Sequence, residues 1–220
     1  MVVPYVTELG RFMINAPPPT LRFGVVLLAA GASTRMGRPK QLLELEGKPL
    51  IARAVEAALG STAWPVIVVL GANSSLIRPR LAKYPVVIAE NFEWEEGMAS
   101  SIRVGVAMAE RFSLALEGLL FAVCDQPHFT STVVEKLVRA LDPTHSIAGA
   151  RYGGRVGVPA LFLRQHFEAL KQLKGPEGAK PVLKSHAAEI APVDLPELEV
   201  DLDTFDEYLR AAAESAQSAD

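Results

Sequence analysis

The sequence has little cysteine, no long apolar run and no excess of basic charge, and each absence removes a class of protein. Cys124 is the only cysteine in 220 residues, which excludes an internal disulfide and a cysteine-rich zinc site. The sequence has no apolar run of about eighteen residues, so we expect no membrane-spanning segment and no membrane partner. A formal net charge of −3, without a basic face, argues against a nucleic-acid binder.

Half of the residues are apolar, which at this length is enough for one sizeable core. We expect residues 1–20, which show no periodicity, to form a loose N-terminal extension. We expect residues 21–213 to form a single domain and residues 214–220 a frayed tail. Because the first twenty residues lack the apolar centre of a signal peptide, we expect a cytoplasmic protein.

Apolar runs alternate along the chain with segments of helical periodicity. Runs typical of buried strands cover residues 25–30, 66–70, 86–89 and 118–124. Helical spacing is found at 49–60, before Lys83, at 100–108 and at 133–141. This alternation predicts a doubly wound α/β fold with a mostly parallel sheet. Ligands of such sheets bind outside the carboxyl ends of the strands, so the loops that follow the strands are the candidate site.

The first strand passes abruptly into a cationic loop. Gly31 and Gly37 leave backbone N–H groups accessible, and Arg35, Arg38 and Lys40 add positive charge. Such a loop suits a polyphosphate, although a basic glycine-bearing turn is also common in α/β proteins. The spacing matches neither G-x-G-x-x-G nor G-x-x-x-x-G-K-[ST], which disfavours dinucleotide oxidoreductases and P-loop NTPases.

The loop resembles the signature L-A-A-G-x-S-x-R-M-G-x-x-K of the MobA-like nucleotidyltransferases, closest to their molybdopterin cytidylyltransferase branch. Resembling blocks follow in order over residues 24–209. The resemblance implies a sheet of the nucleotide-diphospho-sugar transferase (Rossmann-like) type and Mg²⁺ as cofactor. The residues expected to bind nucleotide are Ala29, Ala30, Gly31, Ser33, Arg35, Gly37, Lys40, Asn73 and Asn91.

The second block, N-x-x-W-x-x-G-M-x-S-S, follows the third strand. We expect Ser100 and Ser101 at a helix start, where hydroxyls and free N–H groups could hold an anion. The residues alone leave open a simple N-cap beside a buried Trp94. The resemblance implies that Gly97, Met98, Ser100 and Ser101 bind substrate.

The third block, C-D-Q-P, places a carboxylate directly after a buried strand. Asp125 is a candidate oxygen ligand for Mg²⁺, and a capping role ahead of Thr130 is the alternative. The resemblance favours the metal and implies that Gln126 and Pro127 contact substrate. We expect Cys124 to be a buried core thiol.

Residues 200–208 resemble a D-I-D-T-P-E-D block. Asp201 and Asp203 fall on one side of an extended segment, and Thr204 can cap a helix over residues 205–213. An ordinary acidic helix start has the same composition. The resemblance implies that Asp203 is the second metal ligand.

Two glycine-rich stretches lie between these blocks. Residues 151–159 can form a hairpin connection and resemble the G-x-P-x-x-F block at the edge of the second-substrate pocket. Residues 175–180 resemble G-D-x-G-A-R, with Pro176 and Lys180 as departures. Because lysine lacks the bidentate fork of arginine, Lys180 would contact an oxyanion only as a point charge. The departures therefore affect the identity of the acceptor more than the transfer chemistry.

Together these residues fit metal-assisted nucleotidyl transfer, with Arg35, Lys40 and Asp125 as catalytic residues. The resemblance implies CTP as donor and the terminal phosphate of molybdopterin as acceptor. It also implies a molybdenum hydroxylase or its maturation factor as partner. Four alternatives stay open: GTP or another donor, a sugar or polyol phosphate acceptor, a non-catalytic cofactor-handling protein, and an α/β protein that binds no nucleotide.

Overall fold

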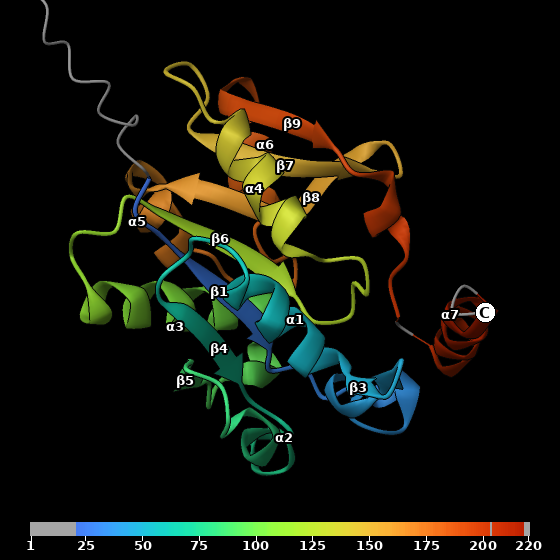
Figure 1. Cartoon of the computed structure of the whole chain (residues 1–220). Coiled ribbons are helices and arrows are strands. Elements are labelled where there is room, and N and C mark those ends of the chain that lie inside the picture. Colours follow the sequence, from blue (N-terminus) through green and yellow to red (C-terminus); the bar gives the residue numbers. More distant parts are fainter. Residues whose placement is uncertain (1–20, 203, 218–220) are drawn as a thin grey trace, which may run out of the picture.

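The computed structural model describes residues 21–202 and 204–217, with side chains as far as residue 213. A sheet of seven strands in the order β5-β4-β1-β6-β8-β7-β9 forms its centre (Figure 1). The strands are β1 Phe23–Ala29, β4 Val66–Leu70, β5 Val87–Glu90, β6 Gly118–Val123, β7 Ile147–Tyr152, β8 Arg155–Leu163 and β9 Ile190–Asp194. A separate small hairpin joins β2 Glu44–Leu45 to β3 Lys48–Pro49.

The sheet is mostly parallel, as predicted. Strand β1 runs parallel to both β4 and β6, with Leu27 opposite Val68 on one side and Ala122 on the other. Strand β8 is antiparallel to its neighbours β6 and β7, and β7 pairs in parallel with β9. The carboxyl ends of β1, β4, β5 and β6 therefore meet at one edge, where the sequence places its polar loops.

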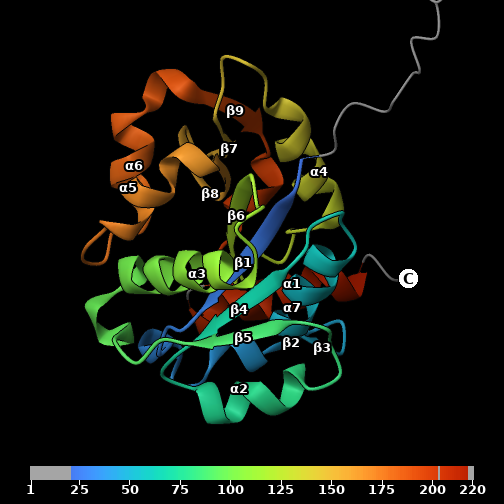
Figure 2. The same cartoon turned by 90° about the vertical axis from the view of Figure 1, so that its left-hand side faces the viewer.

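Helices cover both faces of this sheet (Figure 2). The helices are α1 Leu50–Leu59, α2 Ser74–Leu81, α3 Met98–Phe112, α4 Ser131–Ala140, α5 Phe167–Lys171, α6 Lys180–Ser185 and α7 Phe205–Gln217. Side chains of α1, α2 and α4 pack with Val25 and Leu27 of β1, whereas those of α3, α5 and α6 pack with Val26 and Leu28. Both faces of β1 are thus buried, which explains its continuous apolar run.

The C-terminal helix α7 lies beside the β2–β3 hairpin rather than on the main sheet (Figure 1). Ala211 of α7 packs with Met36 of the cationic loop and with Leu43 after it, and Tyr208 donates a hydrogen bond to the Glu44 carbonyl (2.9 Å). We expected this helix to end at residue 213, but it continues to Gln217, since its alanines and Glu214 favour helix.

Several elements after β6 were not predicted. Strand β9 and helices α5 and α6 have five or six residues each, too few to show a clear period. The predicted hairpin connection is confirmed, since Gly153 (φ 53°) and Gly154 (φ 72°) form a tight turn between β7 and β8. Within the described ranges, no helix has both the length and the apolar character needed to cross a membrane. The expected N-terminal extension, residues 1–20, lies outside the described residues.

Candidate active site

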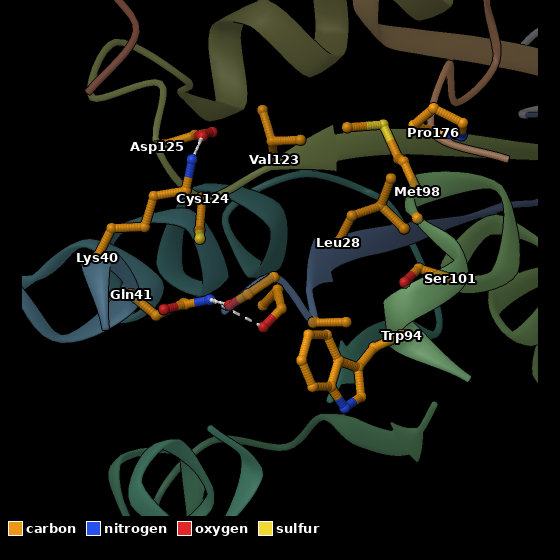
Figure 3. A pocket seen from close by; sticks show the side chains of 14 residues that line it. Leu28, Lys40, Gln41, Trp94, Met98, Ser101, Val123, Cys124, Asp125 and Pro176 are labelled. Carbon is orange, nitrogen blue, oxygen red and sulfur yellow. Dashed lines mark hydrogen bonds and ion pairs between the residues drawn. The ribbon is translucent and has the colours of Figure 1, made fainter. Parts of the chain in front are cut away.

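A pocket of about 270 Å³ opens at the carboxyl ends of β1 and β6 (Figure 3). The residues that line it are Leu28, Ala29, Ala30, Gly31, Lys40, Gln41, Trp94, Gly97, Met98, Ser101, Val123, Cys124, Asp125 and Pro176. They come from the cationic loop, from the start of α3, from the end of β6 and from the glycine-rich stretch after α5. The pocket therefore forms where strand topology brings the separate sequence blocks together.

The cationic loop is built from two short 3₁₀ turns, Thr34–Met36 and Lys40–Leu42. The first ends at Gly37, whose φ of 68° favours glycine. A side chain added at Gly31 would meet no atom within 4 Å, so the space above that residue is open. Arg35 is exposed in this loop and does not line the pocket, and neither do Ser33 and Gly37.

The ion pair between Lys40 and Asp125 joins the loop to the end of β6 (Figure 3). The Lys40 ammonium contacts Asp125 Oδ2, and the two side chains are only 20% and 10% exposed. The other oxygen of the carboxylate, Oδ1, is buried without a hydrogen-bond partner. An unsatisfied buried carboxylate oxygen fits a cation ligand, because no donor of the described residues already occupies it.

Behind this pair, burial raises the pKa of the Cys124 thiol to about 12. The thiol is therefore protonated at neutral pH, and a role as nucleophile is disfavoured. This agrees with the expectation of a buried core cysteine.

The C-terminal acidic segment passes directly beside Asp125. The Leu202 N–H donates to the Asp125 carbonyl (3.1 Å), so Asp201 and residue 203 flank a residue bonded to the end of β6. The predicted second metal ligand, Asp203, lies outside the described residues. Among the described residues, no group of three or more His, Cys, Asp or Glu side chains is arranged to hold a metal.

The second block places Ser100 and Ser101 at a helix start as expected, but the alternative interpretation of these serines as N-caps is wrong. Helix α3 begins at Met98, after Gly97 with φ 115°, so Ser100 and Ser101 lie within its first turn and are not caps. The buried Asn91 amide donates to both serine hydroxyls (2.8 and 2.9 Å), and Ser100 donates to the Gly97 carbonyl (2.8 Å). Ser101 lines the pocket, whereas Ser100 and Asn91 do not and support it from behind.

An apolar wall faces the ion pair across the pocket. Figure 3 shows Met98 and Pro176 at one side and Trp94 at another. The wall depends on close glycine contacts: a Cβ at Gly97 would come within 2.7 Å of Pro176 Cα, and one at Gly178 within 2.5 Å of Met98 Sδ. Sequence reasoning missed Pro176 as a pocket residue. Gly175 and Gly178, which lie on either side of Pro176, are the sequence signal that could have indicated it.

A charged network holds Pro176 in place. Arg103 of α3 donates to the Leu173 carbonyl (2.8 Å) and pairs with Glu96 (2.5 Å). Glu96 Oε1 in turn accepts from the Gly175 N–H (3.3 Å). The hydrogen bond from Arg103 is the main cause that lowers the pKa of Glu96 to about 2. The glycine-rich stretch is therefore fixed to the start of α3.

Three further predicted residues also lie outside the pocket lining. Gln126 is buried, and its amide donates to the Tyr152 hydroxyl (3.2 Å) and the Leu198 carbonyl (3.2 Å), which ties β6 to the β7–β8 hairpin region. Pro127 is buried beside it. Asn73 donates to the Ala32 carbonyl (3.5 Å) at the base of the cationic loop. In this structure Gln126 and Asn73 serve as supports around the pocket.

The comparisons with known proteins agree on one family. The profile of the MobA-like NTP transferase domain matches residues 25–191. The nicotine blue oxidoreductase of Paenarthrobacter nicotinovorans is 37% identical over 142 residues, which cover 64% of this chain and 67% of that protein. The purine catabolism protein PucB of Bacillus subtilis is 32% identical over 196 residues, 83% of this chain and 92% of that protein. The molybdenum cofactor guanylyltransferase of Rhodobacter capsulatus is 33% identical, covering 57% and 62% of the two chains.

Solved structures share the fold. Rv0371c from Mycobacterium tuberculosis superposes with a TM-score of 0.72 at 30% identity, over 88% of this chain and 99% of that one. A manganese complex of Rv0371c gives a TM-score of 0.70 at 26% identity, over 87% and 98%. The sheet is thus of the nucleotide-diphospho-sugar transferase type. With its cationic loop, its ion pair and its matching profile, the chain belongs to the MobA-like NTP transferase family and is a nucleotidyltransferase.

Proposed function

We propose that this chain transfers a CMP unit from CTP to the terminal phosphate of a molybdopterin-type acceptor, with release of pyrophosphate. The observation that carries the proposal is the largely buried Lys40–Asp125 pair, which closes one end of a pocket whose opposite wall is apolar. A cation for phosphate and a carboxylate for a metal ion lie at one end, and Leu28, Val123, Met98 and Pro176 form the apolar wall.

Each charged residue has a role in this reaction. Lys40 and Arg35 bind the β- and γ-phosphates, and the open space above Gly31 admits the phosphates to the loop backbone. Asp125 Oδ1 and Asp203 hold Mg²⁺. When bound, a divalent cation supplies neutralisation of the charge on the phosphate oxygens. The manganese complex of the structural relative supports a divalent cation in this fold.

The bond changes are those of an in-line displacement. An oxygen of the acceptor phosphate forms a bond to the α-phosphorus of CTP, and the bond from that phosphorus to the β-phosphate oxygen breaks. This nucleophile is already anionic at neutral pH, so no general base is needed. The protein contributes positioning and charge stabilisation, which fits a site that offers a lysine and carboxylates.

The apolar wall favours a planar heterocycle over a polyol as the acceptor. Leu28, Val123, Met98 and Pro176 offer no hydrogen-bonding side chain, whereas a sugar or polyol needs several partners when it is buried. The cofactor-related name of the R. capsulatus guanylyltransferase supports the same acceptor class. A molybdenum hydroxylase or its maturation factor would receive the product, and we place this chemistry in the cytoplasm.

The relatives do not support cytidine as the base of the donor nucleotide, because the R. capsulatus protein is named a guanylyltransferase. The L-A-A-G spelling at residues 28–31 supports cytidine. Differential thermal stabilisation tests the choice: with Mg²⁺ present, CTP raises the melting temperature more than GTP does. Equal or greater stabilisation by GTP would contradict cytidine while leaving nucleotidyl transfer in place.

A second candidate comes from the name of the P. nicotinovorans relative, which is an oxidoreductase. The loop spacing between Gly31 and Gly37 lacks the G-x-G-x-x-G pattern of dinucleotide enzymes, which favours the transferase. A panel of acceptors assayed for pyrophosphate release separates the two, since an oxidoreductase releases none. A non-catalytic cofactor-handling protein also releases none, and Asp125→Ala would leave its cofactor delivery intact.

A further inference from the structure

We infer that Gln41 is the positioning residue that holds the cationic loop in its nucleotide-binding conformation. The inference rests on the proposed function. Gln41 follows Lys40 directly, is only 1% exposed, and its side chain reaches back beneath the loop to the end of β1 (Figure 3).

The Gln41 amide makes three contacts with the two ends of the turn. Its Nε2 donates to the carbonyls of Ala29 (3.1 Å) and Gly31 (2.9 Å). Its Oε1 accepts from the Ser33 hydroxyl (3.4 Å). One side chain therefore bonds the last residue of β1 and the first residue of the loop with its two N–H groups, and Ser33 of the loop with its oxygen.

Ser33 closes the network on the other side. Its hydroxyl oxygen accepts from the Lys40 N–H (3.1 Å), so Lys40 and Gln41 both bond to Ser33 across the loop. Ser33 has a φ of 55°, a left-handed conformation that residues other than glycine adopt rarely. The Gln41 network thus holds a backbone shape that the loop sequence does not favour by itself.

These bonds also set the direction of the loop backbone. In a trans peptide the carbonyl and the following N–H point in opposite directions. Because the carbonyls of Ala29 and Gly31 are drawn toward Gln41, the N–H groups of Ala30 and Ala32 are turned away from it. The same bonds fix the base of the turn from which Lys40 reaches Asp125.

The inference predicts a loss of nucleotide affinity rather than of chemistry. If Gln41→Met leaves the loop competent for about a tenth of the time, the KM for CTP rises about tenfold, since apparent affinity falls with the competent fraction. Saturating CTP restores the loop, so kcat and the KM for the acceptor change less than about twofold. Gln41→Glu raises the KM for CTP further, because a carboxyl group cannot donate to both carbonyl oxygens.

The experiment measures kcat and both KM values by pyrophosphate release and amide hydrogen exchange in residues 30–40. Gln41→Met and the milder Ser33→Ala should each speed exchange there, and Ser33→Ala keeps the test available if Gln41→Met does not fold. Leu137→Ala, in the core of α4, is the control: it lowers the melting temperature and leaves the KM for CTP unchanged. An unchanged KM for CTP and unchanged exchange in the Gln41 and Ser33 variants would overturn the inference. A wild-type chain that releases no pyrophosphate contradicts the proposed function instead.

Discussion

Replacing Asp125 by asparagine should tighten nucleotide binding in the absence of metal while it removes turnover. In the free protein Asp125 holds the Lys40 ammonium, which the phosphates of the nucleotide must recruit. Asparagine keeps the shape of the side chain and removes the charge. The ion pair that competes with the phosphates for Lys40 is then removed, and one negative charge near the phosphates is lost, so both effects favour nucleotide binding.

The size of this effect follows from the burial of the pair. A hydrogen bond to a charged group contributes roughly 1.5–3 kcal/mol. Because Lys40 remains 20% exposed, solvent screens part of the attraction and the lower end of that range applies. A gain of about 1.4 kcal/mol corresponds to a tenfold lower Kd for metal-free CTP. With Mg²⁺ present, Asp125→Asn should no longer bind CTP more tightly than the parent, because the variant lacks the carboxylate that holds the cation.

Tryptophan fluorescence can report this binding directly. The chain has two tryptophans, and Trp94 lines the pocket, whereas Trp64 lies before β4 at the opposite end of the sheet. Trp64→Phe leaves Trp94 as the reporter. Asp194→Asn is the matched control, since Asp194 also pairs with a cation, Arg151 (2.5 Å), but on the β9 edge. An Asp125→Asn protein that binds metal-free CTP no more tightly than the parent would refute the reasoning.

Three further perturbations test the stability and chemistry of the site. Lys40→Ala should lower kcat/KM for CTP by about 10²- to 10³-fold, because it removes a phosphate contact, and it should also lower the melting temperature, because it leaves the largely buried Asp125 carboxylate without its cation; an unchanged kcat/KM would contradict the phosphate-binding role of Lys40. Because folding lowers the pKa of Glu96 from 4.5 to about 2, the ionised carboxylate stabilises the fold fully above pH 4.5, and this contribution is lost as the pH falls toward 2. The free energies of unfolding in urea of the parent and of Glu96→Gln should therefore differ at pH 7 and converge at low pH. Leu137→Ala should cost about 2–5 kcal/mol in the free energy of unfolding by urea, and activity per folded molecule should stay unchanged.

The sequence predicted those parts of the fold in which local pattern and burial agree. Strand β1 is buried on both faces and reads as a continuous apolar run, and α1 shows its apolar residues at helical spacing up to Gly60. Strand β9 carries Pro192 and lies at the sheet edge with mixed burial, so its pattern is weak. Its place beside β7 depends on contacts with residues more than forty positions away.

For the site, the sequence predicted that Lys40 and Asp125 would meet, but it did not predict the residues that support them. Lys40 and Asp125, 85 positions apart, meet as the parallel topology requires. Gln41 was not predicted, because a glutamine after the loop belongs to no distinctive motif. Its role appears only in the structure, where its amide donates to the carbonyls of Ala29 and Gly31. Asn91 and Gln126 are buried amides that satisfy neighbouring polar groups, a role that sequence alone does not separate from ligand binding.

Transfer of CMP to a molybdopterin-type acceptor is tested by pyrophosphate release with purified molybdopterin cofactor and each of the four nucleoside triphosphates. We expect release that requires both the acceptor and Mg²⁺, is fastest with CTP, and falls by about 10²-fold or more in Asp125→Asn. Absence of release with all four nucleotides, or full release by Asp125→Asn, would contradict it.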